Sequence, residues 1–206
     1  MSRPPILLET ARMFFRELVP EDLTQLLELD QDPEVMRFIS KGVPTSRETY
    51  EQDYLPRMLS YQNQNPPRGF WAAHRREDGR FIGWFHLRPD KITPEEMELG
   101  YRLARQAWGA GLATEGSRAL IEKGFDEWGC DQISARTLVV NLASQRVMQK
   151  AGLVFESEFL YGEELLPGWT EPERRAVKYS RTRIAYLAGK VERFCNQGLT
   201  PPRRQG

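Results

Sequence analysis

One segment constrains the fold of this chain more than any other, because a strand-like run passes through a glycine-containing turn directly into a helix-like run. Residues 97–103 alternate in polarity as a strand does, and residues 112–128 have helical spacing. Between them stand Gly109 and Gly111, which permit positive φ angles and place no side chain in the turn. We therefore expect a strand–turn–helix unit whose helix begins with unpaired backbone N–H groups.

Unpaired N–H groups at a helix start, together with the helix dipole, form an anion site of the kind that holds a pyrophosphate. The turn alone does not establish such a site, because two glycines before a helix are more often only a tight turn. It also lacks the Gly-Lys-Ser/Thr end of a Walker A sequence and the three glycines of a dinucleotide-binding sequence. Nucleotide binding by this turn therefore remains only an alternative.

The rest of the chain alternates between strand and helix patterns, which predicts a mixed α/β sheet. A length of 206 residues suits one such domain better than two. We assign the domain to residues 1–182, and residues 183–206 to a C-terminal helix and a frayed basic tail. Further strands are expected at 12–18, 69–76, 80–88, 133–140, 153–161 and 176–180, and further helices at 23–29, from 32, and at 45–61, 143–151 and 184–195.

A hairpin is expected where Glu77-Asp78-Gly79 separates two aromatic-rich runs. Strict alternation along the second run places its side chains on two faces of the sheet. One face would carry Phe81, Gly83, Phe85 and Leu87, and the other Ile82, Trp84 and His86. Aromatic residues in strands usually belong to the core, so we assign the aromatic side chains of this hairpin no other role.

Charge and composition exclude several classes of function. The 29 basic and 29 acidic residues cancel, so no net positive field favours nucleic acid. The apolar run Ile6 to Leu8 is shorter than a signal-peptide core, and no segment approaches the ~20 apolar residues of a membrane span. Cys130 and Cys195 are too few for a disulfide framework. We expect a cytoplasmic protein with two ordinary thiols and no membrane contact.

The two histidines, His74 and His86, fall on neighbouring expected strands. No further candidate ligands cluster with them in the sequence, so we expect ordinary sheet histidines and no metal site.

Two sequence blocks resemble the GNAT superfamily of N-acetyltransferases. Gln106-Ala107-Trp108-Gly109-Ala110-Gly111 fits the Gln/Arg-x-x-Gly-x-Gly/Ala signature of that superfamily. Farther on, Asn141-Leu142-Ala143-Ser144-Gln145-Arg146-Val147-Met148-Gln149-Lys150-Ala151-Gly152-Leu153 is similar to the block Asn-x-x-Ser-x-Arg-Val-Met-x-Lys-x-Gly-Phe. That block is typical of the branch related to ribosomal-protein N-terminal acetyltransferases of the RimJ/RimL type. The resemblance covers roughly residues 10–182 and includes the last strand near 175–180.

The resemblance implies a GNAT-type α/β fold with a mixed, mostly antiparallel sheet, splayed between its fourth and fifth strands and flanked by helices on both faces. The splayed strands would be residues 96–104 and 132–140. Acetyl-CoA would lie in the gap, with its pantetheine arm on the backbone of the fourth strand and its pyrophosphate on the glycine turn. The cofactor-binding residues implied are Tyr101, Arg102, Leu103, Gln106, Ala107, Trp108, Gly109, Ala110, Gly111, Leu112, Ala113, Thr114, Asn141, Ser144 and Arg146.

Attack of an amine on a thioester needs a base for the amine and a proton for the departing thiolate. Resemblance suggests Glu98 as the base and Glu158 as its rival. The alternative for Glu98 is that it simply belongs to a solvated acidic edge with its neighbours Glu95 and Glu96. The chain departs from the family pattern at Arg136, because some peptide acetyltransferases of the superfamily place a glutamate there.

Protonation of the thiolate is assigned by the same resemblance. Many superfamily members donate this proton from a tyrosine in the second block, where this chain has Met148, which cannot donate one. Ser144 is the substitute that the resemblance suggests. The alternative for Ser144 is a helix N-cap.

We therefore expect transfer of an acetyl group from acetyl-CoA to a primary amine, which belongs to a peptide or protein N-terminus, a lysine or a small molecule. No Ser–His–Asp or Cys–His arrangement suggests an acyl-enzyme, so transfer would be direct, in a ternary complex. A non-catalytic acyl-CoA-binding module that signals to a partner is the alternative. The chain would be a monomer or a homodimer, since helix 184–195 suits packing on its own domain or on a second copy.

Overall fold

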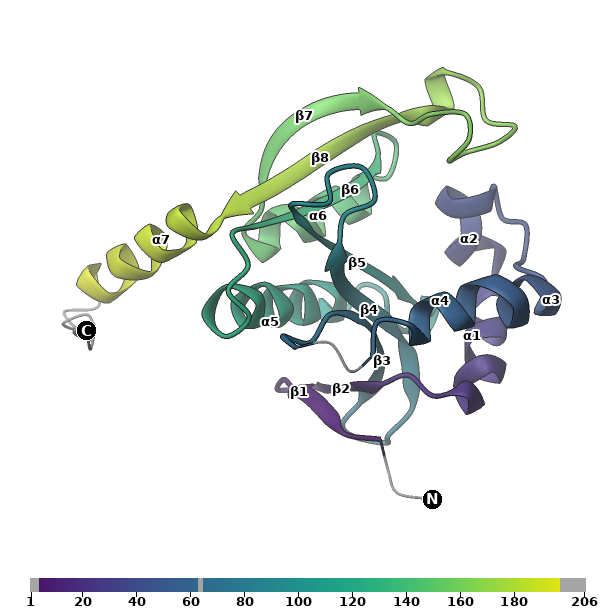
Figure 1. Ribbon diagram of the computed structural model, residues 1–206, viewed down its shortest axis with the longest axis horizontal. Helices are drawn as coiled ribbons and strands as arrows, with labels where there is room; N and C mark the ends of the chain where they lie inside the picture. The colour runs from purple at the N-terminus through teal and green to yellow at the C-terminus, as the bar shows by residue number, and fades with distance from the viewer. Residues whose placement is uncertain (1–3, 63–64, 197–206) are drawn as a thin grey trace.

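The computed structural model describes residues 4–62 and 65–196, which form one eight-stranded sheet with helices on both faces (Figure 1). The strand order is β1-β2-β3-β4-β5-β6-β8-β7. Every neighbouring pair is antiparallel except β5 and β6, which are parallel. The strands are β1 (Ile6–Glu9), β2 (Met13–Glu17), β3 (Gly69–Arg75), β4 (Phe81–Pro89), β5 (Met97–Leu103), β6 (Gln132–Leu138), β7 (Val154–Leu160) and β8 (Arg175–Thr182).

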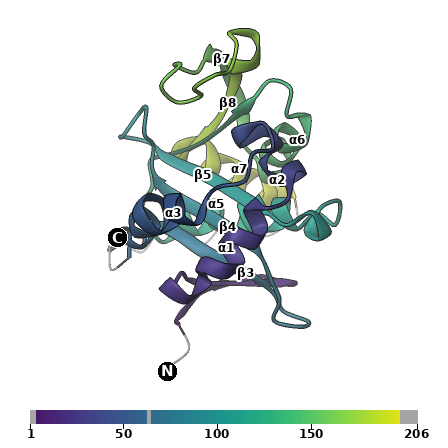
Figure 2. The same ribbon diagram turned by 90° about the vertical axis from the view of Figure 1, so that its right-hand side faces the viewer.

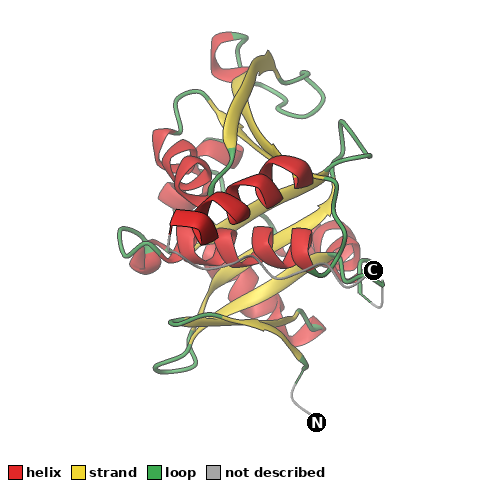
Figure 3. Cartoon of the chain, turned by 90° about the vertical axis from the view of Figure 1, so that its left-hand side faces the viewer, coloured by secondary structure: helices red, strands yellow, loops and turns green. Residues whose placement is uncertain are grey.

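Two layers of helices cover the sheet. Figure 2 shows the helices that precede β3 on one face, and Figure 3 shows α5 and α7 on the other. Each layer has its own apolar core, one beneath α5 and α6 and the other beneath α1 and α4. The helices are α1 (Leu23–Asp30), α2 (Pro33–Ser40), α3 (Arg47–Thr49), α4 (Leu55–Leu59), α5 (Leu112–Asp126), α6 (Leu142–Ala151) and α7 (Arg183–Asn196).

Short signals in the sequence set several helix boundaries. Asp32 precedes Pro33, and its carboxylate caps α2 by accepting a hydrogen bond from the backbone N–H of Glu34. The helix expected at 45–61 begins at Arg47, after the N-cap Ser46, and is not uniform. Its middle, Tyr50–Tyr54, is a π-helical turn that separates α3 from α4. Pro56 follows at once and has no N–H for an intrahelical bond, so a local widening of the helix is understandable there.

The strict alternation expected along β4 is wrong at its start. Ala73 pairs with Gly83 while His74 pairs with Phe81, so Ile82 is an extra residue that forms a β-bulge. As a result Ile82 joins Phe85 in the core beneath α5, whereas Phe81 packs on the opposite core.

The N-terminal strand β1 was not expected, because its four residues form too short a pattern to separate from an irregular tail. It pairs with β2 and adds one strand to the count, so the splayed strands expected as the fourth and fifth are β5 and β6.

The sheet opens between β5 and β6, as the resemblance implied. Their paired register contains only Met97 with Ile133 and Glu98 with Ser134. Beyond Glu98, β5 continues for five residues without a β6 partner, so its backbone edge faces a gap. This gap lies directly before the glycine turn, and it sets the position of the site.

The C-terminal helix α7 packs on its own domain. Tyr186 is buried, its ring stacks on Phe125 of α5 at a centroid distance of 4.8 Å, and its hydroxyl donates to Asp126. The frayed tail expected after this helix lies outside the described residues. In the part of the chain that the structure describes, none of the helices has the length and apolarity needed to cross a membrane.

Candidate active site

A cavity of about 830 Å³ occupies the opening between β5 and β6. One half is bounded by β5, the glycine turn and the first turns of α5 and α6. The other half is bounded by α2, the end of β4, the loop at 90–92 and the segment 161–166 after β7. We call these the turn half and the loop half of the cavity.

The glycine turn has the backbone that its sequence predicted. Gly109 and Gly111 have φ angles of 72° and 79°, and Gly111 is the N-cap of α5. The first backbone bond of the helix runs from the N–H of Glu115 to the carbonyl of Gly111. Within the described residues, the N–H groups from Gly109 to Thr114 donate to no protein acceptor. Six successive free donors at a helix start fit a diphosphate.

Arg12, which the sequence analysis did not single out, holds this turn from outside the cavity. Its guanidinium donates to the carbonyl of Ala110 at 2.7 Å and to the carboxylate of Glu115 at 2.6 Å. On the other side, the indole N–H of Trp108 donates to the carbonyl of Leu103 at 2.8 Å. These contacts fix the turn to β5 and to the first turn of α5. No sequence signal marked Arg12, because it lies about a hundred residues before its partners.

All but two of the expected cofactor-binding residues line the cavity. The exceptions are Gln106, in a short 3-10 turn, and Ala110, whose carbonyl faces Arg12. Arg102 lines the cavity, but its guanidinium is already bonded to Asp30 on α1 at 2.5 Å. Its contribution to a bound ligand would therefore come from the β5 backbone.

Ser144 and Tyr101 form a hydroxyl pair in the turn half. Their oxygen atoms are 3.0 Å apart, and both side chains line the cavity. Burial raises the pKa of Tyr101 to about 12, although the bond to Ser144 opposes the rise, so Tyr101 keeps its proton at neutral pH. The N-cap of α6 is Asn141, whose side chain accepts from the backbone N–H of Ser144 at 3.2 Å. The alternative that Ser144 itself caps this helix is therefore wrong.

Glu98 lines the loop half, close to Arg88 and Tyr161. Its carboxylate accepts a hydrogen bond of 2.5 Å from the guanidinium of Arg88, which stands opposite it on β4. Burial raises the pKa of Glu98, and the charges of Arg88 and Lys91 only partly offset this. Burial and the charge of Glu98 also raise the pKa of Tyr161. The antiparallel pairing of 80–88 with 97–103 could have identified Arg88 from the sequence, whereas nothing marked Tyr161.

The other candidate carboxylates lie elsewhere. Glu158, on β7, is half-exposed in an ion pair of 2.8 Å with Arg175 and does not line the cavity. Glu95 is exposed, as a solvated edge would be. Glu96 is buried and accepts from Lys178 at 2.7 Å and from Gln132 at 3.1 Å.

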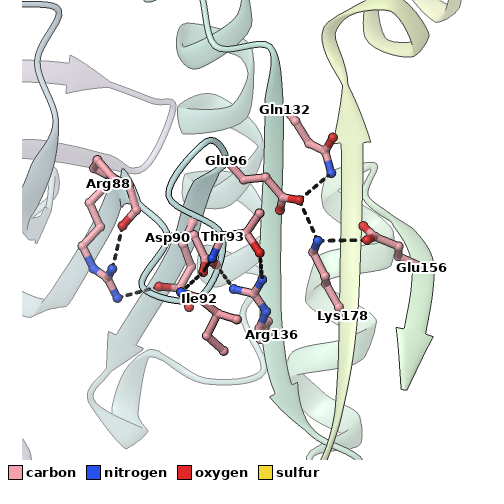
Figure 4. A network of polar contacts seen from close by, with 11 residues as sticks. Arg88, Asp90, Ile92, Thr93, Glu96, Gln132, Arg136, Glu156 and Lys178 are labelled. Carbon is pink, nitrogen blue, oxygen red and sulfur yellow. Dashed lines mark hydrogen bonds and ion pairs between the residues drawn. The ribbon is translucent and has the colours of Figure 1, made fainter. Parts of the chain in front are cut away.

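Buried ion pairs hold the strands around the opening together (Figure 4). Lys178 of β8 bridges Glu96 and Glu156, which joins the loop just before β5 to β7. Arg136 of β6 pairs with the buried Asp90, whose carboxylate also accepts from two backbone N–H groups of the loop after β4. Arg136 stands where some related enzymes have a glutamate, and its charge is thus neutralised within the frame of the site.

The two histidines do not meet. The ring of His74 stacks on Phe14, and its Nδ1 lies 3.0 Å from the carbonyl of Gly79. His86 is buried between Phe70 and Trp84 on the face beneath α4. Burial lowers the pKa of both imidazoles, so both are neutral near pH 7.

A splayed sheet, an anion-binding turn at the splay and a partly buried carboxylate in the same cavity define an acyltransferase site of the kind that uses an acyl-coenzyme A donor. The sequence model described as "Acetyltransferase (GNAT) domain" matches residues 12–154. The chain therefore belongs to the GNAT acetyltransferase family, as its two motif blocks indicated, and it is an acyltransferase.

Relatives and solved structures agree with this assignment. The chain is 32% identical to the FsC-acetyl coenzyme A-N(2)-transacetylase of Aspergillus fumigatus, over 87% of this chain and 77% of that protein. It is 26% identical to the putative ribosomal N-acetyltransferase YdaF of Bacillus subtilis, over 69% of this chain and 78% of that protein. Its fold is similar to the crystal structure of spermidine N-acetyltransferase from Vibrio cholerae in complex with CoA and spermine, with a TM-score of 0.68 and 15% identity, covering 86% of this chain and 99% of that one.

Proposed function

We propose that this acyltransferase moves an acetyl group from acetyl-CoA to a primary amine by direct attack within a ternary complex. The observation that carries the proposal is one cavity that contains both an anion site for the donor and a base for the acceptor amine. Its turn half offers six free backbone N–H groups, and its loop half holds a partly buried carboxylate of raised pKa. The named relative supports the donor and the kind of acceptor atom, because its name specifies acetyl coenzyme A and a nitrogen.

The donor would occupy the turn half. The N–H groups from Gly109 to Thr114 would hold its diphosphate, and Arg146, which lines the same half, adds a cation suited to phosphate. The unpaired edge of β5 beyond Glu98 would take the amide-bearing arm as an added strand. When bound, the donor supplies the acetyl thioester.

Glu98 would accept a proton from the acceptor amine, directly or through a water molecule. An ammonium group has no lone pair, so attack requires its neutral form. A carboxylate whose pKa is raised by burial is a better base than an exposed one, and the ion pair with Arg88 favours its ionised form. Of the two carboxylates expected as candidates, only Glu98 lines the cavity, so we retain it and not Glu158.

Ser144 would give a proton to the departing sulfur. The Tyr101 hydroxyl, which stays protonated, can donate to the Ser144 oxygen at 3.0 Å and leave the serine hydrogen free to point into the cavity. No group in this scheme forms a covalent intermediate with the acetyl group.

The test is release of free thiol from acetyl-CoA in the presence of a panel of primary amines, with mass detection of acetylated products. We expect thiol release that depends on an amine. Glu98→Gln should lower kcat by about 10²–10⁴-fold, as loss of a general base does, and leave the dissociation constant of coenzyme A unchanged. Glu158→Gln is the matched control and should retain activity.

The alternative, a non-catalytic acyl-CoA sensor, makes a different prediction. A sensor would bind coenzyme A but release no thiol above background with any amine. Binding without turnover across a broad panel would therefore refute the catalytic proposal. Equal loss of activity in both glutamate variants would refute the assignment of the base.

A further inference from the structure

A second, smaller cavity adjoins the loop half of the site. It has a volume of about 190 Å³ and lies between the helical segment 50–61 and the sheet face formed by β3, β4 and β5. We call it the side cavity. Tyr54, Arg88, Lys91 and Arg102 line both it and the main cavity, so the two spaces are neighbours with a shared wall. A ligand with its amine near Glu98 would have its other end within reach of this space.

The charge around the side cavity is of one sign. Four cationic residues line it and no aspartate or glutamate does. Three of the four have anionic partners outside the lining: Arg57 pairs with Asp53, Arg88 with Glu98, and Arg102 with Asp30. Lys91 is different, since no carboxylate lies within ion-pair distance of it among the described residues.

The pKa of Lys91 is consistent with this arrangement. Partial burial is the largest cause and lowers this pKa, the positive charges of Arg57 and Arg88 lower it further, and Glu98 and Asp53 raise it. A carboxylate beside Lys91 would stabilise its charged form.

Three residues that line the same space carry buried polar atoms without partners among the described residues. The indole N–H of Trp84 and the Nε–H of Arg102 are buried and donate to no acceptor in the described residues. His86, with 6% of its surface exposed, also has an unpartnered Nδ1. Unsatisfied buried polar groups are costly, so a native structure usually provides each of them with a partner. A ligand rich in acceptor oxygens would supply partners for these donors.

We propose that the side cavity binds a carboxylate of the acceptor substrate, so the preferred acceptors are amines that also carry a carboxylate. Lys91 would pair with the carboxylate, and Trp84 would donate to it. The aromatic side chains Tyr54, Tyr61 and Phe70 would pack on the carbon skeleton between the two ends. This inference rests on the proposed function and adds the class of acceptor to it.

The test compares amines in pairs that differ only by the carboxylate: lysine with cadaverine, ornithine with putrescine, and tyrosine with tyramine. Thiol release from acetyl-CoA gives kcat/KM for each. We expect the carboxylate-bearing member to be preferred by about tenfold or more, a typical factor for one charge-assisted contact. Equal or greater kcat/KM for cadaverine, putrescine and tyramine would overturn this inference while leaving acetyl transfer to amines intact. No thiol release with any amine would instead refute the proposed function.

A matched variant separates a local contact from a general charge effect. Lys91→Met removes the charge from an exposed side chain of similar length, and Lys123→Met removes one from α5, outside both cavities. We expect Lys91→Met to raise KM for the carboxylate-bearing amines about tenfold and to leave KM for their decarboxylated partners unchanged. Lys123→Met should change neither. Equal effects of Lys91→Met on both members of a pair would contradict a carboxylate contact.

Two further measurements test the chemistry of the contact. Trp84→Phe keeps an aromatic ring but removes the N–H donor, so it should weaken selection for the carboxylate without abolishing turnover. O-phosphoethanolamine compared with ethanolamine tests whether phosphate is the preferred anion. If only that pair shows a preference for the anionic member, the carboxylate assignment is wrong.

Discussion

The glycine turn can be tested by filling it. Gly111→Trp adds an indole at a residue that lines the cavity beside the free N–H groups, and a Cβ has room there because it meets only Arg12 Nη2, at 3.6 Å. The substitution also forces a left-handed backbone onto a bulky residue. Gly79→Trp, in the β3–β4 turn, is the matched control, since Gly79 has a φ of 69° and nothing within 4 Å of its Cβ position. Both variants should lose about 1–2 kcal/mol of unfolding free energy to backbone strain.

Ligand affinity should separate the two variants. A charge-assisted hydrogen bond contributes about 1.5–3 kcal/mol, and an indole in the turn would block at least two of the six donors. The dissociation constant of coenzyme A should therefore rise about 10²–10⁴-fold in Gly111→Trp. It should not change in Gly79→Trp, which lies outside the cavity.

Calorimetric titration with coenzyme A measures the binding, and urea unfolding of both variants measures the strain. Coenzyme A affinity in Gly111→Trp equal to that of Gly79→Trp would refute the assignment of the diphosphate to this turn. Protection of the unmodified protein against heat by ATP or NAD, without protection by coenzyme A, would refute it independently.

Three further predictions concern the walls of the cavity. Arg88→Met removes a cation that lowers the pKa of Glu98, so that pKa should rise further; since the base acts only when ionised, the acid limb of the kcat/KM profile should move to higher pH. Ser144→Ala should lower kcat about 10²-fold or more, whereas Tyr101→Phe should lower it only about tenfold, because it removes one supporting hydrogen bond. Asp30→Ala removes the buried partner of Arg102, whose guanidinium is mostly covered, and should cost up to about 3–5 kcal/mol of unfolding free energy in a urea titration.

Each of these has an outcome that contradicts it. If the acid limb of the kcat/KM profile is unchanged in Arg88→Met, that limb does not reflect the ionisation of Glu98. A smaller loss of kcat in Ser144→Ala than in Tyr101→Phe would indicate that Tyr101, and not Ser144, donates the proton to the thiolate. Unfolding of Asp30→Ala at the same urea concentration as the unmodified protein would show that the buried pair does not stabilise the fold.

The parts of the fold that depend on local pattern were predictable. The strand at 97–103, the turn with Gly109 and Gly111, and the helix after it were expected from residue spacing, and the structure has all three. The bulge at Ile82 was missed because it is set by pairing with β3, and its one mark in the β4 sequence is the neighbouring Gly83, which has a φ of 134°. The four-residue strand β1 was missed for a related reason, since its partner strand decides whether so short a run is a strand.

The candidate site also has a part that the sequence predicted and a part that it did not. Residues near the turn were identified because they are consecutive in sequence. The loop half depends on long-range contacts, such as Arg88 with Glu98 or Tyr161 near both, and only the first of these follows from strand register. Sequence spacing also could not separate Glu98 from Glu96, which lies two residues earlier, just before β5. Their environments differ because Glu96 meets Lys178, 82 residues away.

The pairing of Ser144 with Tyr101 would support the proposed proton donor, because Met148 stands where many superfamily members have a tyrosine. Met148 cannot donate, and a lone serine hydroxyl is a weak acid that also tends to bond with its local backbone. Here the α6 cap is formed by Asn141, so the hydroxyl of Ser144 is not consumed by the helix end. Tyr101, with a pKa of about 12, can donate to that oxygen throughout the neutral range. In the proposed scheme the serine proton would go to the departing thiolate, and the Tyr101 hydroxyl would donate to the serine oxygen that is left negative.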